Sequence, residues 1–203
     1  MNKIQSTKSL TCAETARLLR QVLKESFPGV KFSVKSSTYS GGASISIRWT
    51  DGPNDAQVRA AVGGFESAYF DGSIDYQGCI YHMMDGQPIQ FGADYINTSR
   101  EHSDAAIEAA IGALWRRYGA QMREQGIERP SVADFRSCRL WSVRLGGNFD
   151  DLQGMVDQIL AKRSDRLCGD RSPLASRVFV THDDGYSRAY GCGFSAVPEN
   201  QKV

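Results

Sequence analysis

The residue types best able to do chemistry in this chain are five cysteines and three histidines, scattered over 203 residues. Cys79 and His82 have a Cys-x-x-His spacing, which occurs among zinc ligands. The residues around them alternate as in a strand, where side chains three positions apart point to opposite faces. A structural zinc ion also needs four ligands in a tetrahedron. The sequence therefore predicts no metal site, and it predicts no cofactor.

A cysteine nucleophile assisted by a histidine is the second chemistry to consider. Two pairs could be brought together by folding, Cys79 with His102 and Cys192 with His182. The alternative is that each thiol fills core space or is an unreactive surface group. A Cys/His-dependent enzyme stays open as an alternative function, and no residue is assigned a catalytic role.

The tripeptide His102-Ser103-Asp104 contains the residue types of a catalytic triad. Triad members come from separate elements, because adjacent side chains rarely face one another. A helix start explains the same residues, with Ser103 as N-cap and Asp104 in the first turn. Nucleotide-binding, zinc-protease and serine-hydrolase motifs are missing from the sequence. These observations favour a protein that acts without catalysis.

Basic residues could instead bind a partner. Residues 116–144 contain seven arginines against three acidic residues. Guanidinium groups and exposed rings are the groups that bind phosphates and stack on bases. The alternative is a solvated helix face with salt bridges, and the net charge of +1 is low for a dedicated nucleic-acid binder. The candidate contacts to nucleic acid or to a partner protein are Lys31, Lys35, Arg48, Arg116, Arg117, Arg123, Arg136, Arg139 and Trp141.

Acidic residues are concentrated in the middle of the chain. The net charge is +6 over residues 1–48, −8 over residues 49–108 and +3 over residues 109–203. An array of carboxylates could compete for a groove built to hold phosphates. Solubility and pairing with the basic block are the alternatives. The candidate acidic contacts to a partner are Asp71, Asp75, Asp85 and Asp94.

A β-hairpin is predicted to position part of the basic group. Apolar residues alternate with polar ones on both sides of Gly41-Gly42, a pair that permits chain reversal. The alternating apolar residues are Val30, Phe32 and Val34 before the turn and Ile45, Ile47 and Trp49 after it. Lys31, Lys35 and Arg48 therefore share the opposite face, which is either simply solvated or contacts phosphates.

The remaining pattern predicts an α+β fold, in which an antiparallel sheet of hairpins is packed by three or more helices. Helices are predicted from the Thr11 capping box to Phe27, after Pro53, and from Ser103 to Gly126. A second hairpin is predicted over 80–91, extended by 94–97. Beyond these, the pattern predicts helices near 130–135 and 148–163 and a strand at 177–181, followed by a turn that leads to 186–190. We expect one region over 8–126 and a smaller α+β region over 127–203, either separate or on the same core.

The compartment is predicted from what the sequence lacks. No apolar run approaches the roughly 20 residues that span a bilayer. The first residues lack the apolar centre of a secretory signal. Scattered cysteines in odd number are typical of reduced thiols. We therefore expect a cytoplasmic protein with no membrane partner. The oligomeric state is not predicted.

Three segments resemble a known family. They are KSLTCAET at Lys8–Thr15, the hairpin segment Phe27–Pro53, and FDGSID at Phe70–Asp75. Together they resemble large polyvalent-protein-associated domain 29, over about residues 8–96. The resemblance implies that the chain comes from a plasmid, integrative element or phage. It also implies an association with proteins that help incoming DNA to establish itself, often encoded beside counter-defence genes. It supplies no catalytic motif.

These observations lead to one expected function and two alternatives. The leading expectation is a non-enzymatic binding protein of a mobile element that docks on a host protein or nucleoprotein complex, as in counter-defence against CRISPR or restriction. The alternatives are a direct DNA- or RNA-binding protein and the Cys/His-dependent enzyme.

Overall fold

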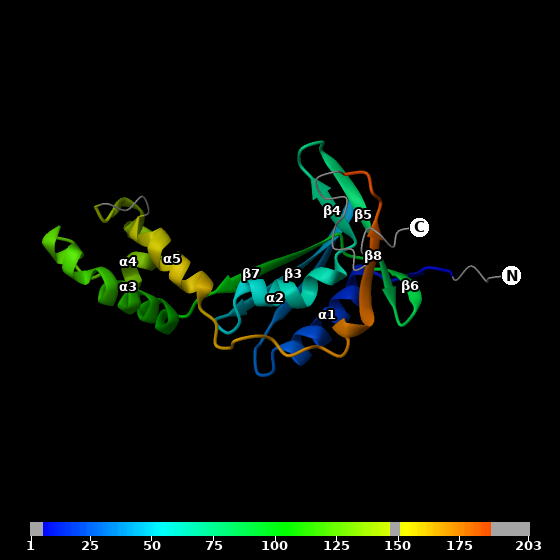
Figure 1. The fold of residues 1–203 in the computed structure, drawn as a ribbon, viewed down its shortest axis with the longest axis horizontal. Coiled ribbons are helices and arrows are strands. Elements are labelled where there is room, and N and C mark those ends of the chain that lie inside the picture. Colours follow the sequence, from blue (N-terminus) through cyan, green and yellow to red (C-terminus); the bar gives the residue numbers. More distant parts are fainter. Residues whose placement is uncertain (1–5, 147–150, 188–203) are drawn as a thin grey trace, which may run out of the picture. The chain divides into compact units, whose positions relative to one another are not determined.

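The computed structural model of the chain describes residues 6–146 and 151–187, which form two compact units (Figure 1). The first unit contains residues 6–49, 55–99 and 168–187, and the second contains residues 50–54 and 100–167. This division differs from the expected regions 8–126 and 127–203. The long third helix packs with later helices, and the last described strand pairs with a strand of the first unit.

The elements follow one another as β1 (Lys8–Ser9), α1 (Cys12–Ser26), β2 (Ser33–Tyr39), β3 (Gly42–Thr50), α2 (Asp55–Val62), β4 (Ala68–Asp71), β5 (Tyr76–Met84), β6 (Gln87–Gln90), β7 (Tyr95–Glu101), α3 (Asp104–Glu124), α4 (Val132–Arg136), α5 (Leu152–Lys162) and β8 (Val178–Asp183). Short 3₁₀ turns lie at Gly63–Phe65, Arg139–Ser142 and Ala175–Arg177. The α+β class is confirmed. The predicted segments 148–150 and 188–190 lie outside the described residues.

The strands form two sheets, and both are mixed. One has the order β1-β6-β5-β4, with β8 also paired to β5, and β1 runs parallel to β6. The other has the order β2-β3-β7. Hydrogen bonds from Asp94 N to Ala43 O and from Asp51 N to Glu101 O, both 2.9 Å, show that β7 runs parallel to β3. The expected hairpins are present, but β7 joins the first hairpin and does not extend the second.

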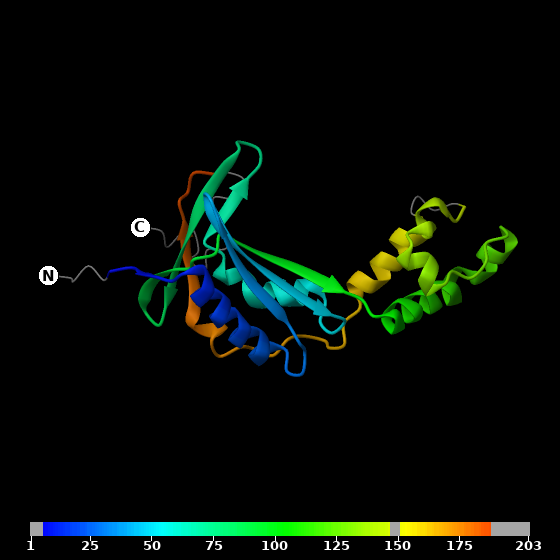
Figure 2. The same cartoon turned by 180° about the vertical axis from the view of Figure 1, so that it is seen from behind.

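The core of the first unit lies between α1, α2 and one face of the β2-β3-β7 sheet. The Thr11 capping box that starts α1 is present, and Leu19 and Leu23 of the helix are buried. Ile45 and Ile47 of β3 are fully buried against them. Figure 1 shows α2 in front of β3, and Figure 2 shows the strands in front of α2. The alternation of apolar and polar residues in the hairpin therefore predicted correctly which residues are buried and which are exposed.

The second unit is helical, with a core between α3, α4 and α5. The guanidinium of Arg100 joins the two ends of this unit. It donates to the carbonyls of Asp51 and Gly52, both at 3.0 Å, and to those of Leu160 at 3.1 Å and Arg163 at 2.8 Å. The last two carbonyls lie at the end of α5, where carbonyl groups lack partners within the helix.

We predict that Arg100→Ala lowers the free energy of unfolding by about 2–4 kcal/mol, because four carbonyls lose a charged donor. Urea unfolding followed by circular dichroism measures the change. Arg144→Ala removes an exposed arginine of the same unit and should change the value by less than about 0.5 kcal/mol. Equal stability of the wild type and Arg100→Ala would contradict the assigned role.

Candidate partner-binding surface

The side of the β2-β3-β7 sheet that faces away from α1 and α2 is polar, and we call it the outer sheet face. Its residues are Ser33, Lys35, Ser37 and Tyr39 on β2, Ser44, Ser46 and Arg48 on β3, and Tyr95, Asn97 and Ser99 on β7. Each is exposed or half-buried, whereas the alternate residues Val34, Ile47 and Ile96 are buried. Strand alternation alone produces this separation.

The predicted cations lie on this face or beside it. Ser33 pairs with Arg48, and Lys35 pairs with Ser46, so both charges stand among hydroxyl groups. Lys31 precedes β2 and is exposed. Within residues 6–146 and 151–187, none of Lys31, Lys35 and Arg48 forms an ion pair. A partner can therefore bind these cations without displacing an internal carboxylate.

One end of the outer sheet face is closed by a tight turn. The Asp94 carboxylate accepts a hydrogen bond of 2.8 Å from Ala43 N, beside the exposed ring of Tyr39. A Cβ atom on Gly42 would stand 2.7 Å from this carboxylate and 3.0 Å from that ring, so only glycine fits. Partial burial and the Asp94 charge raise the pKa of Tyr95. Asp94 thus organises this end of the face.

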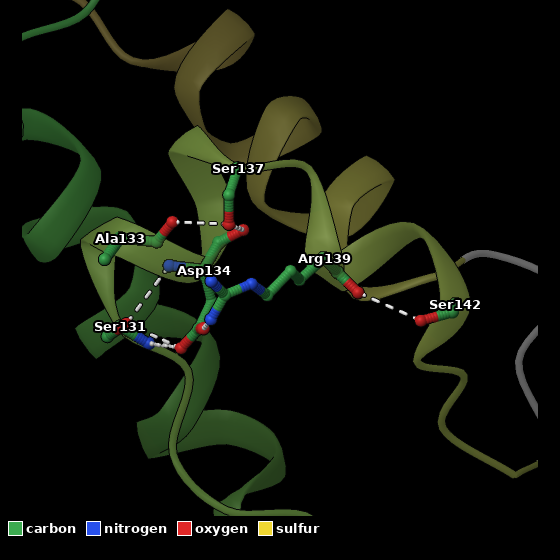
Figure 3. Close-up of polar contacts among 6 residues, drawn as sticks. All are labelled: Ser131, Ala133, Asp134, Ser137, Arg139 and Ser142. Carbon is green, nitrogen blue, oxygen red and sulfur yellow. Dashed lines mark hydrogen bonds and ion pairs between the residues drawn. The ribbon is translucent and has the colours of Figure 1, made fainter.

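Two of the predicted arginines are held by carboxylates within the second unit. Arg136 donates to Asp104 Oδ1 at 2.9 Å and to the His102 carbonyl at 2.6 Å. Arg139 lies 3.4 Å from Asp134, whose carboxylate also caps the start of α4 through Ser131 (Figure 3). These pairs are exposed and each contributes little to stability. They match the alternative of a helical surface with salt bridges.

The other predicted residues of this unit are on or near the surface. The guanidinium of Arg117 lies 5.1 Å from the Tyr118 ring, and that of Arg123 lies 5.4 Å from the Trp115 ring. Arg116 is exposed on the same helix. Trp141 follows α4 and is 56% exposed. Within the described chain, none of the α3 arginines forms an ion pair.

Most carboxylates of the predicted acidic group make contacts within the fold. Asp71 is 2% exposed and accepts hydrogen bonds from Ser73 and Ser187. Asp85 has a positive φ of 54° in the β5–β6 turn and is paired with Arg177. Asp94 binds the backbone of β3. Asp75 is exposed in the β4–β5 turn, with a φ of 52°. Three of the four carboxylates are therefore engaged within the fold, and contacts of these residues with a partner stay a prediction.

The cysteine and histidine candidates are placed as follows. Cys79 is exposed on β5, whereas His82 is buried on the same strand, so they face opposite ways. Burial lowers the pKa of His82 to about 4. Cys79 and His182 line a cleft of about 600 Å³ on the β5–β8 sheet. His102 belongs to the other unit, and Cys192 lies outside the described residues.

The surroundings of Cys79 in this cleft are not those that activate a thiol as a nucleophile. The His182 ring stacks on Tyr81, with centroids 4.5 Å apart, and its Nδ1 lies 3.0 Å from the Thr181 hydroxyl. No hydrogen bond joins it to Cys79 within the described residues. Among these residues, no three His, Cys, Asp or Glu side chains could hold a metal ion. The cleft therefore places a cysteine near a histidine and leaves the enzyme alternative unsupported.

Sequence reasoning missed one polar cluster. Asp184 accepts hydrogen bonds from the hydroxyls of Tyr69 at 2.6 Å and Tyr76 at 2.8 Å, and from Cys79 N at 3.0 Å. Burial acts to raise the pKa of Asp184, but these donors outweigh it and lower the pKa to about 2. The partners are more than 100 residues apart in the sequence, so no local signal could have revealed them. The cluster anchors the end of β8.

Comparison with known families agrees with these observations. Residues 10–103 match large polyvalent protein associated domain 29. The match extends from the residue before the α1 cap to the α3 cap, and so includes the whole β2-β3-β7 sheet. It stops before the body of α3. No curated protein and no solved structure matches the chain.

The match confirms the resemblance seen in the sequence. Domain 29 connects the chain with polyvalent proteins of mobile elements or phages. Lys31, Lys35, Arg48 and Asp94 lie inside domain 29, whereas the arginines of α3 and α4 lie outside it. In the described part of the chain, every helix is too short or too polar to cross a membrane.

We predict that iodoacetamide labels Cys79, Cys138 and Cys168 in the folded protein and spares Cys12. The first three are exposed. Cys12 is 5% exposed, and burial raises its pKa, so little thiolate is available. Mass spectrometry of peptides after a short reaction measures the difference, and labelling in urea is the control. Equal labelling of Cys12 and Cys79 in the native protein would contradict this packing.

Proposed function

We propose that this protein is a non-enzymatic binding protein of a mobile genetic element or phage, which docks on a host protein or nucleoprotein complex. Counter-defence against CRISPR or restriction systems is the process that fits domain 29 best. The observation that supports the proposal most is the outer sheet face. It is polar, exposed, inside domain 29, and carries cations that no described carboxylate neutralises.

The chemistry of this face indicates the kind of surface that it would bind. Lysine and arginine side chains among hydroxyl groups complement carboxylates or phosphates. A nucleoprotein complex displays both groups. The face lies on strands that are packed on a core, so the backbone positions of Lys35 and Arg48 are fixed before binding. A rigid surface loses less conformational entropy on association.

We expect the variant Lys31→Ala/Lys35→Ala/Arg48→Ala to lose the host partner that the wild-type protein retains. A tagged protein is incubated with host lysate at low and moderate salt, and retained proteins are identified by mass spectrometry. The matched control is Arg17→Ala/Lys24→Ala/Arg59→Ala, which removes the same charge from exposed positions on α1 and α2. Retention of the same partners by both variants would exclude the outer sheet face.

Direct binding of nucleic acid is the second candidate function. It is favoured by the position of Tyr39, which is 52% exposed at the end of the strand that carries Lys35. An exposed ring beside cations is the combination that stacks a base while the charges bind phosphates. The partner would then be DNA or RNA itself, with no protein required.

For this candidate we expect a labelled single-stranded 20-mer to bind at about 50 mM salt and to dissociate steeply towards about 200 mM salt. Each phosphate-contacting cation that is removed should reduce the slope of log affinity against log salt by about one. Fluorescence anisotropy with the two triple variants measures this. If no anisotropy change occurs at the lowest salt, direct nucleic-acid binding is wrong, while docking on a protein remains open.

A further inference from the structure

Helix α5 leaves part of a second row of apolar side chains exposed, beside the row that its core buries. Leu152, Val156 and Leu160 are buried against α3 and form one stripe along the helix. Met155 and Ile159, four residues apart, form a second stripe that is only partly buried. Residues at this spacing lie on one helix face. A second apolar stripe on a surface helix is typical of a helix that contacts a further partner.

This second stripe lines an open hollow of about 310 Å³ between α5 and α3, which we call the α3–α5 groove. Its apolar lining comes from Met155 and Ile159 on one side and from Leu114 and Tyr118 on the other. Methionine adapts its shape to irregular partners, which suits it to such a surface. All lining residues belong to the second unit.

The rim of the α3–α5 groove is basic. The only charged residues among its lining side chains are Arg117 and Lys162, one on each helix. Both are exposed, and within the described residues neither forms an ion pair. Arg117 is also held against the Tyr118 ring, which limits the conformations that it must lose on binding. The groove thus has an apolar floor between two positively charged side chains, one on each helix.

We propose that the α3–α5 groove binds an acidic amphipathic helix of a partner protein. Walls formed by two helices and an apolar floor favour a helix as the occupant. Its residues at i, i+3/i+4 and i+7 would fill the floor. The basic rim selects acidic residues along the flanks of that helix. Arg117 and Lys162 are the only cations among the residues that line the groove, whereas a groove that follows a phosphate backbone needs a row of them.

A second copy of this chain does not fit the groove as well. The exposed face of α1 carries Arg17, Arg20 and Lys24, so it would be repelled by the rim. On α2 the ion pair between Asp55 and Arg59 leaves no net charge. Among the described helices, none presents an apolar stripe flanked by acidic residues. The inference does not depend on the outer sheet face, which lies in the other unit.

The probe for this test is a fluorescein-labelled 16-residue peptide with leucine at helical spacing and glutamate at the flanking positions. Control peptides have the same composition in scrambled order, or lysine in place of glutamate. We expect the protein to bind only the acidic amphipathic peptide. The ¹³C-methyl signal of Met155 should shift, whereas the signals of Met83, Met84 and the buried Met122 should not.

Two variants distinguish binding in the groove from a general attraction of the acidic peptide to positive charge. Arg117→Glu places a like charge on the rim and should weaken binding by about tenfold or more. Arg144→Glu makes the same change at an exposed residue of the same unit outside the groove and should alter affinity by less than about twofold. Thermal unfolding of both variants checks that the fold is retained. The outer-face triple variant should bind the peptide like the wild type, so this result stands apart from the proposed function.

The inference is wrong if the acidic peptide fails to bind or binds no better than the scrambled peptide. It is also wrong if Arg117→Glu binds like the wild type. A shift of the Met155 signal on dilution of the free protein, with a change in sedimentation, would assign the groove to a second copy. A shift caused by a single-stranded 20-mer that the peptide cannot displace would assign it to nucleic acid. Both outcomes overturn the proposal.

Discussion

The first unit and its candidate surface both depend on which residues of the β2–β3 hairpin face the core and which face solvent. In a strand the side-chain period is two, so a slip of one residue would turn Ile45 and Ile47 to solvent and Lys35 and Arg48 into the core. Burying those charges without partners would cost far more than the fold gains from any single contact. Burial of the apolar face therefore fixes where the cations stand. The exposed charge pattern follows from the same packing that makes the domain stable, so no further interaction is needed to position these cations.

Local patterns predicted elements of both units well, and non-local contacts could not be predicted in the same way. The Thr11 capping box, the alternation around Gly41-Gly42 and the stripe of α3 each involve residues close in sequence, and each gave the observed element. The parallel pairing of β7 with β3 and the pairing of β8 with β5 join segments separated by about 50 to 100 residues. Pairing between such distant strands leaves no periodic pattern in a single sequence from which it could be predicted. The fold class was therefore accessible, and the sheet order was not.

The same distinction explains why the internal contacts of the acidic candidates could not be predicted, whereas the exposure of the hairpin cations could. A carboxylate is a strong acceptor and readily accepts hydrogen bonds from donors that are distant in the sequence. Asp71 accepts one from the Ser187 hydroxyl, and Asp94 accepts one from the backbone N–H of Ala43. Composition shows that such residues are present but not that a fold uses them. Lys35 and Arg48 stand on a strand whose other face is buried, so their exposure was determined locally. Exposure that follows from alternation is thus better evidence for a binding surface than an excess of one charge along a segment.

The second unit is built so that the chain enters and leaves it at one place. Arg100 binds the carbonyls of Asp51 and Gly52 on one side and of Leu160 and Arg163 on the other, and Asp165 N donates to Gly52 O. Segments whose ends lie together can be inserted into another domain at a small cost in loop entropy. The match to domain 29 ends at residue 103, where α3 is about to begin. An insertion closed in this way can change its helices without disturbing the sheet that precedes it. The charged and apolar side chains on the surface of α3 and α5 can therefore change independently of those on the outer sheet face.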